Sequence, residues 1–227
     1  MTDIIVLSDP RVAAVPLDDC AEPLVDIRDT PQLLLDGRKA DGFGAYARTR
    51  SGVLDRLLRA QRALPSGTRF LVVEAYRPPG LQREHFEAYS AALRAAHPEA
   101  SLARIRELAS AYISPPEVAP HVSGGAIDLT LCAEDGTELP LGTEVNATPE
   151  ESDNACRTNA PNIDATARAH REVMRRALTS AGFVNYPTEW WHWSYGDRYW
   201  ALLSGQRAAR YGPVELPDGT ENSAPPA

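Results

Sequence analysis

Two short stretches of the sequence are the most informative about its fold and chemistry. They are residues 121–128, His-Val-Ser-Gly-Gly-Ala-Ile-Asp, and residues 189–192, Glu-Trp-Trp-His. His121 and Asp128 are seven positions apart, so on one straight strand they would point to opposite faces. Gly124 and Gly125 between them permit a tight bend that brings His121 back over the face of Asp128. Asp128 lies on the polar side of an otherwise apolar strand, where a carboxylate needs a partner.

The second stretch supplies a further histidine and a further carboxylate. Glu189 and His192 are three positions apart, and a Pro-Thr pair precedes them. We therefore expect Glu189 in the turn that leads into a strand and His192 on the strand itself. Two imidazoles and one carboxylate leave one tetrahedral zinc position open for water, and a second carboxylate can take the proton of that water. The pattern predicts one zinc ion per chain, held by His121, Asp128 and His192.

Each of these residues also has an ordinary structural explanation. A lone histidine is usually a surface or core residue, and we interpret His85, His97 and His170 in this way. For the three predicted ligands, that explanation requires three coincidences at once. Arg77 alone could form a structural ion pair. Trp190 and Trp191 are more typical of a core or a pocket wall than of specific substrate contacts.

Working outward, the chain predicts an α+β fold in which a small antiparallel sheet is flanked by helices. Hydrophobic spacing predicts helices over residues 53–64, 81–96, 101–112 and 164–181, and strands over residues 23–28, 69–76, 126–131 and 190–195. The polar stretch 132–162 lacks clear periodicity, so we expect an excursion near the site. We expect one domain over residues 1–212, which contains the zinc site, and a disordered, proline-rich tail over residues 213–227.

Composition excludes several classes of partner. Of 227 residues, 43% are hydrophobic and 24% charged, which is typical of a globular protein. The net charge of −8 disfavours binding to nucleic acid or anionic membranes. The start of the chain has no pattern of a secretory signal, and the sequence has no apolar run of 18 residues that could span a membrane. The three cysteines are widely spaced, so they predict neither a disulfide framework nor a thiolate zinc site. We expect a cytoplasmic protein, and the oligomeric state stays open.

Several separated motifs, in order along the chain, resemble the D-alanyl-D-alanine dipeptidases of the vancomycin-resistance type. These zinc peptidases are related to the D,D-carboxypeptidases and to the hedgehog signalling domain. The resemblance runs from about Pro23 to about Tyr199. It is carried by Glu74-Ala75-Tyr76-Arg77-Pro78, Ser114-Pro115, His121 through Leu131, Leu141-Gly142-Thr143, and Gly182-Phe183 through Glu189-Trp190-Trp191-His192.

The resemblance implies a role for each matching residue. His121, Asp128 and His192 match the zinc ligands, and Glu189 matches the general base that activates the water and passes its proton to the leaving amine. Arg77 matches the arginine that stabilises the developing oxyanion, a contribution of roughly 3–4 kcal/mol for such a group. The expected substrate is a small dipeptide. Ser123, Asn146, Trp190 and Trp191 are expected to contact it.

Two departures from the family pattern bear on the substrate. Glu144-Val145-Asn146 follows Thr143 where the family usually has an aromatic residue and an aspartate, in a region thought to hold the amino terminus of the dipeptide. Ala119-Pro120 stands where serines are common, and Glu144 could supply a replacement anion. Two alternatives therefore remain: a D,D- or L,D-carboxypeptidase acting on peptidoglycan precursors, and a non-catalytic zinc-binding domain.

Overall fold

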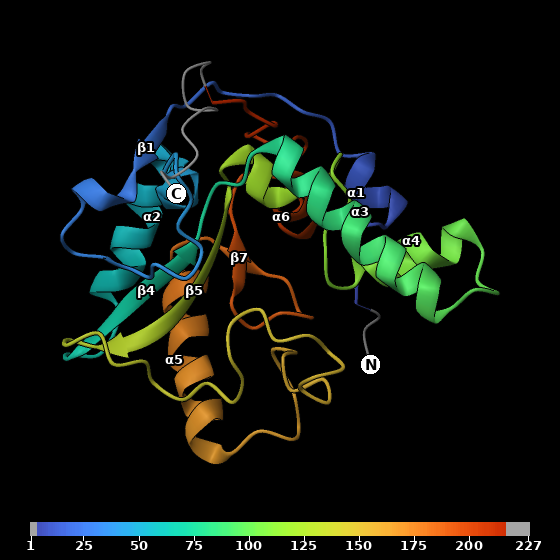
Figure 1. Cartoon of the computed structure of the whole chain (residues 1–227). Coiled ribbons are helices and arrows are strands. Elements are labelled where there is room, and N and C mark those ends of the chain that lie inside the picture. Colours follow the sequence, from blue (N-terminus) through green and yellow to red (C-terminus); the bar gives the residue numbers. More distant parts are fainter. Residues whose placement is uncertain (1–3, 217–227) are drawn as a thin grey trace.

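The computed structural model describes residues 4–216 and shows an α+β architecture built on a five-stranded sheet (Figure 1). The strand order is β2-β4-β5-β7-β6. The bounds are β2 Leu34–Leu35, β4 Thr68–Glu74, β5 Ala126–Ala133, β7 His192–Ser194 and β6 Val184–Asn185. A separate antiparallel pair joins β1 Leu24–Asp26 to β3 Arg48–Arg50.

Two long helices cover one face of the sheet. Helix α2, Ser51–Arg62, buries Val53, Leu57 and Ala60 at helical spacing. Helix α5, Ala165–Ser180, begins at Asp164, whose carboxylate accepts a hydrogen bond of 2.7 Å from the amide of Ala167. Apolar side chains of both helices join those of β4 and β5 in one hydrophobic core.

The remaining helices form two further pairs. Helices α3, Pro79–Ala96, and α4, Leu102–Ser110, pack against each other and lie to the right of β7 in Figure 1. Two short helices, α1 Pro10–Ala13 and α6 Arg198–Leu203, contact each other. The loop between β5 and α5 is held by Arg171 of α5, whose buried guanidinium donates to the carbonyls of Leu141, Ala155 and Arg157.

The α+β fold class predicted from the sequence is confirmed, and the long predicted elements appear close to their expected bounds. One pairing differs from the predicted antiparallel sheet, because β2 runs parallel to β4. The chain passes through β3 and α2 between these two strands, and such a crossover connection permits parallel pairing. The remaining pairs of the sheet are antiparallel.

The beginning of the predicted tail is attached to the body of the protein. Val214 donates a backbone hydrogen bond to the carbonyl of Val122, and the hydroxyl of Tyr76 donates to the carbonyl of Val214. From residue 217 onward the predicted tail lies outside the described residues. Within residues 4–216, no helix combines the length and the apolar character required to cross a bilayer.

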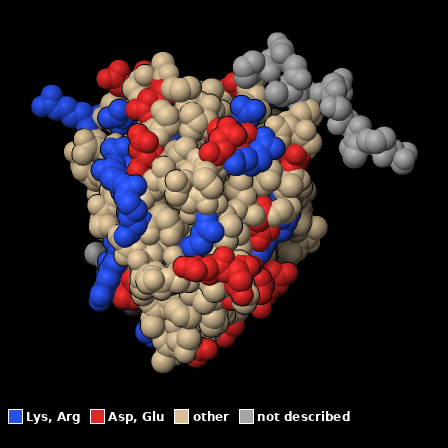
Figure 2. Space-filling model, turned by 90° about the vertical axis from the view of Figure 1, so that its left-hand side faces the viewer, with Lys and Arg blue, Asp and Glu red and all other residues tan. Residues whose placement is uncertain are grey.

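Charges of both signs are mixed on the surface. Figure 2 shows a basic stripe along one edge of the face that it presents and an acidic band in the lower half.

Candidate metal centre and active site

Three neighbouring strands place Glu74, Asp128 and His192 in one row. Glu74 at the end of β4 pairs with Asp128 of β5, and Asp128 pairs with His192 at the start of β7. Residues directly opposite in an antiparallel pair share a face of the sheet. A register shift between Val72 and Glu74 brings Glu74 into this row.

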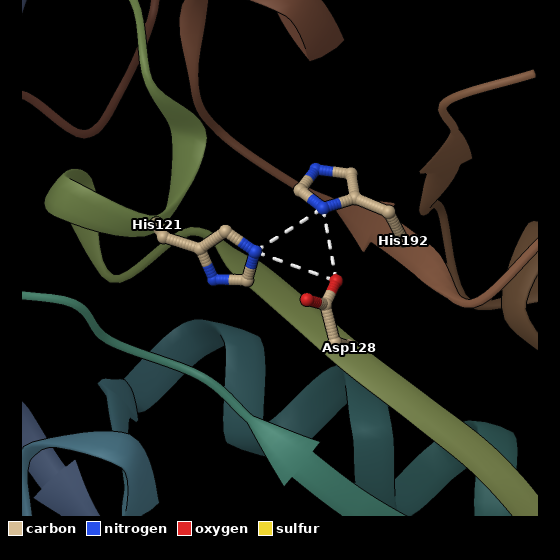
Figure 3. Close-up of side chains that lie close together, drawn as sticks. All are labelled: His121, Asp128 and His192. Carbon is tan, nitrogen blue, oxygen red and sulfur yellow. Dashed lines mark hydrogen bonds and ion pairs between the residues drawn. The ribbon is translucent and has the colours of Figure 1, made fainter. Parts of the chain in front are cut away.

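His121 reaches the same row from the short 3-10 helix η3, Pro120–Ser123. Gly124 ends this helix with a φ of 68°, and a Cβ there would lie 2.4 Å from a methyl group of Leu24. A glycine is therefore required at the bend that the sequence predicted. The imidazoles of His121 and His192 and the carboxylate of Asp128 point toward one another (Figure 3).

The three facing atoms have the spacing of a tetrahedral metal site. His121 Nε2 lies 3.2 Å from His192 Nδ1 and 3.4 Å from Asp128 Oδ1, and His192 Nδ1 lies 3.0 Å from Asp128 Oδ1. Ligands at ordinary zinc distances, arranged tetrahedrally, lie about 3.3 Å from each other. All three residues are buried, so water does not form hydrogen bonds with their facing nitrogen and oxygen atoms, and these atoms need another partner.

The second ring nitrogen of His121 forms a hydrogen bond that orients the imidazole for binding a cation. Nδ1 of His121 lies 2.6 Å from the carbonyl of Ala75 and donates to it, which leaves the Nε2 lone pair facing Asp128. Burial alone would lower the pKa of His121 and raise that of Asp128. Their mutual attraction outweighs burial, raising the pKa of His121 and lowering that of Asp128. Either a proton or a metal ion satisfies this contact, and two imidazoles with one carboxylate are a zinc-type donor set.

Glu189 lies at the edge of the cluster, in the turn before β7 as expected. Its Oε2 is 3.9 Å from His192 Nδ1. The side-chain amide of Asn185 donates to the carbonyls of both Glu189 and His192 and so fixes the turn. Burial, together with the nearby negative charge of Asp128, raises the pKa of Glu189 well above its usual range, although Arg77 opposes this.

Arg77 follows β4 and is held rigidly. Its Nε and Nη2 donate to the two oxygens of Glu74 at 2.7 and 2.6 Å, and Nη1 donates to Gln82 at 2.7 Å. Burial would lower the pKa of Arg77, but the Glu74 carboxylate raises it, so the guanidinium stays charged. Glu74 belongs to the motif quoted from the sequence, yet its role as the partner that orients Arg77 is visible only in the structure.

These groups open onto a small cavity of about 100 Å³. Of the expected substrate contacts, Asn146 lines it, while Ser123, Trp190 and Trp191 do not. The hydroxyl of Ser123 donates to the carbonyl of Pro120 and accepts from the amide of Gly125, so it stabilises η3. Trp190 and Trp191 are buried in the core, and Trp190 donates to Thr143.

The cavity also contains residues that the sequence interpretation did not assign to it: Lys39, His85, Tyr112, Ile113 and Ser114. Ser114 lies in a motif that carried the resemblance, whereas Lys39 and His85 had no such signal. Glu144, suggested as a replacement anion, does not line the cavity and lies 3.8 Å from Arg38 with its side chain largely exposed.

Residues 52–208 match the family model described as D-ala-D-ala dipeptidase. The chain belongs to this family. The D-alanyl-D-alanine dipeptidase of a Synechocystis strain is 30% identical over 89% of this chain and 96% of its own length. The D-alanyl-D-alanine dipeptidase of Escherichia coli is 35% identical over 32% of this chain and 35% of its own length.

Membership of the D-ala-D-ala dipeptidase family confirms the resemblance stated from the motifs and the predicted enzyme class, a metallopeptidase. Among solved structures, the LD-carboxypeptidase LdcB is 16% identical, with a TM-score of 0.46 over 84% of this chain and 78% of that one.

Proposed function

We propose that this protein hydrolyses D-alanyl-D-alanine or a closely related dipeptide, using one zinc ion held by His121 Nε2, Asp128 Oδ1 and His192 Nδ1. The observation that carries the proposal is the separation of these three atoms by 3.0–3.4 Å in a buried cluster. When bound, zinc supplies a Lewis acid for the peptide carbonyl and lowers the pKa of water to roughly 7.

Glu189 acts as the general base. Its buried carboxylate lies beside the ligand cluster, and its raised pKa gives it a stronger attraction for a proton than an ordinary carboxylate has. Glu189 takes a proton from the attacking water and delivers it to the nitrogen of the leaving amino acid. Because burial holds the side chain in place, the two transfers need little rearrangement.

Arg77 stabilises the negative charge that develops on the carbonyl oxygen. Its contacts with Glu74 and Gln82 fix the guanidinium before the substrate binds. A preorganised cation of this kind does not have to reorient during the reaction. The presence of both Arg77 and Glu189 at the cluster supports an enzyme over a non-catalytic zinc domain.

The size of the cavity supports a short substrate. A volume of about 100 Å³ is well below the several hundred Å³ usual for pockets that enclose larger ligands. A dipeptide suits a site of this size, whereas a carboxypeptidase that trims peptidoglycan precursors needs a longer groove for the rest of the peptide.

The proposal is tested with a substrate panel. The zinc-loaded protein is given the four stereoisomers of alanyl-alanine and stem peptides that end in D-Ala-D-Ala, and released alanine is measured. We expect the D,D dipeptide to be cleaved fastest, with loss of activity on chelation and recovery on addition of zinc. Faster trimming of the stem peptides would support the carboxypeptidase instead, and no cleavage of any dipeptide would refute the proposed function.

A further inference from the structure

Lys39 is the single lysine of the chain, since the other 22 of the 23 basic residues are arginines. It lies in the connection between β2 and β3, and it lines the cavity that contains the ligand cluster. No other residue of the segment between these two strands reaches the cavity. Lys39 is therefore the residue through which this connection contributes to the cavity wall.

The neighbouring residue Arg38 differs from Lys39 in its ion pairs. Arg38 forms ion pairs with Asp36, Glu138 and Glu144. Lys39 has no ion pair with any carboxylate of residues 4–216 within 4.0 Å, and its side chain is exposed to the solvent. Its ammonium group is thus free to bind an anion that enters the cavity.

Two cations, Lys39 and Arg77, line the cavity together with the carboxylates of Asp128 and Glu189. Arg77 and His85 line the same cavity, and Lys39 is close enough to His85 to contribute to its electrostatics. Burial lowers the pKa of His85, and the charges of Arg77 and Lys39 lower it further against the opposing charge of Glu74, which favours the neutral imidazole. The guanidinium of Arg77 is committed to Glu74 and Gln82, which leaves Lys39 as the cation available for a second anionic group.

We propose that Lys39 binds the free α-carboxylate of the substrate and so makes this protein selective for peptides that end one residue after the scissile bond. The inference rests on the proposed dipeptidase function. A dipeptide carries a charge at each end, and its ammonium group would be repelled by Lys39 and Arg77. The carboxylate is attracted to the same wall, so the charge orients the substrate. A peptide that is extended at its carboxyl end has a neutral amide at that position and gains nothing from Lys39.

The first test compares substrates with and without the carboxylate. The kcat/KM of the wild type and of K39M is measured on D-alanyl-D-alanine and on its C-terminal amide. We expect K39M to lose at least about tenfold on the free acid, the range for a hydrogen bond to a charged group, and to match the wild type on the amide. K39R, which keeps the charge, should recover part of the loss.

A matched control removes one positive charge elsewhere. Arg59 is exposed on α2, and no residue of α2 lines the cavity. R59M should therefore have the same ratio of acid to amide cleavage as the wild type. Cleavage of dipeptides by the wild type together with an unchanged ratio in K39M would overturn the role of Lys39 while leaving the proposed function intact.

The second test does not depend on turnover. Reductive methylation with ¹³C-formaldehyde labels Lys39 and the amino terminus and keeps the charge of both, and the signal of Lys39 is assigned by its absence in K39R. We expect this signal to shift on addition of D-alanine, which carries the carboxylate of the leaving group, and not on addition of D-alaninamide. An unchanged Lys39 signal at saturating D-alanine would overturn the proposal.

Discussion

Glu189 is the side chain on which the proposed proton transfers depend. In E189Q the amide has nearly the same shape but cannot take a proton, so we expect kcat to fall by about 10²–10⁴-fold with zinc still bound. Activity on D-alanyl-D-alanine and zinc content by atomic absorption are measured together. Full activity in E189Q with one zinc per chain would exclude Glu189 as the base.

The pH dependence of catalysis follows from the same carboxyl group. Burial and the charge of Asp128 raise the pKa of Glu189, and a base acts only when it is deprotonated. We therefore expect kcat/KM to fall as the pH is lowered, with a midpoint above pH 4.5. Metal content is checked at each pH, because protonated histidines release zinc. A constant kcat/KM down to pH 4.5, with zinc retained, would contradict this assignment.

Single residues were predictable where the chemistry needs an unusual residue type at a defined spacing. His121, Asp128 and His192 were chosen on that ground, and the structure brings them together. Ser123 and the two tryptophans also lie within motifs, but their hydrogen bonds and packing serve the fold. Lys39 approaches the cavity from a loop without periodicity, so only tertiary structure could reveal it.

At the level of elements, Glu22 joins segments that are distant in sequence. Its carboxylate accepts hydrogen bonds from the amide of Gly52 at the start of α2, at 2.8 Å, and from the hydroxyl of Tyr211, at 2.7 Å. It also pairs with Arg210 at 3.1 Å. Burial would raise the pKa of Glu22, but these contacts outweigh it and lower the pKa below its usual value of 4.5.

We expect E22Q to lower the free energy of unfolding by about 1 kcal/mol at pH 7. A carboxyl group with a lowered pKa in the folded state stabilises above its unfolded-state pKa, and this contribution is lost as the pH falls through the folded-state value. The difference from the wild type should therefore be smaller at a pH well below 4.5 than at pH 7.

Urea denaturation at both pH values, with a chelator present throughout, measures this difference. E134Q, which removes an exposed carboxylate with no hydrogen-bond partner among the described residues, serves as the control. A difference between E22Q and wild type that stays constant with pH would show that ionisation of Glu22 is not the cause.

Long elements were predictable because their side chains repeat with a clear period. The helix expected over residues 53–64 is α2, and the strand expected over residues 69–76 is β4. The two-residue strands β2 and β6 are too short to show a period, and they are defined by the strands beside them. The loop of residues 134–163 also lacks a period of its own. Its conformation is set by hydrogen bonds from the buried Arg171.

On the scale of the whole molecule, a metal ion would connect three segments. The ligands come from η3, β5 and β7, so an ion bound only by the folded protein should stabilise the entire fold. At a free concentration 1,000 times the Kd this effect is about 4 kcal/mol, which corresponds to roughly 10 °C in Tm for a chain of this size.

Calorimetry with zinc and with chelator measures the stabilisation. H192A should lose it, and H97A, which changes an exposed histidine outside the cluster, should retain it. Equal Tm values for the wild type with and without zinc would show that the cluster does not bind the ion in the folded state.

The row formed by Glu74, Asp128 and His192 has a consequence for refolding. Because side chains alternate between the faces of a sheet, a shift of β5 by a single position relative to its neighbours would turn Asp128 away from both partners. A misaligned sheet could keep most of its hydrogen bonds and its circular dichroism, but it could not hold the ion. Regained zinc affinity after denaturation is therefore a direct measure of how many molecules have aligned their strands correctly.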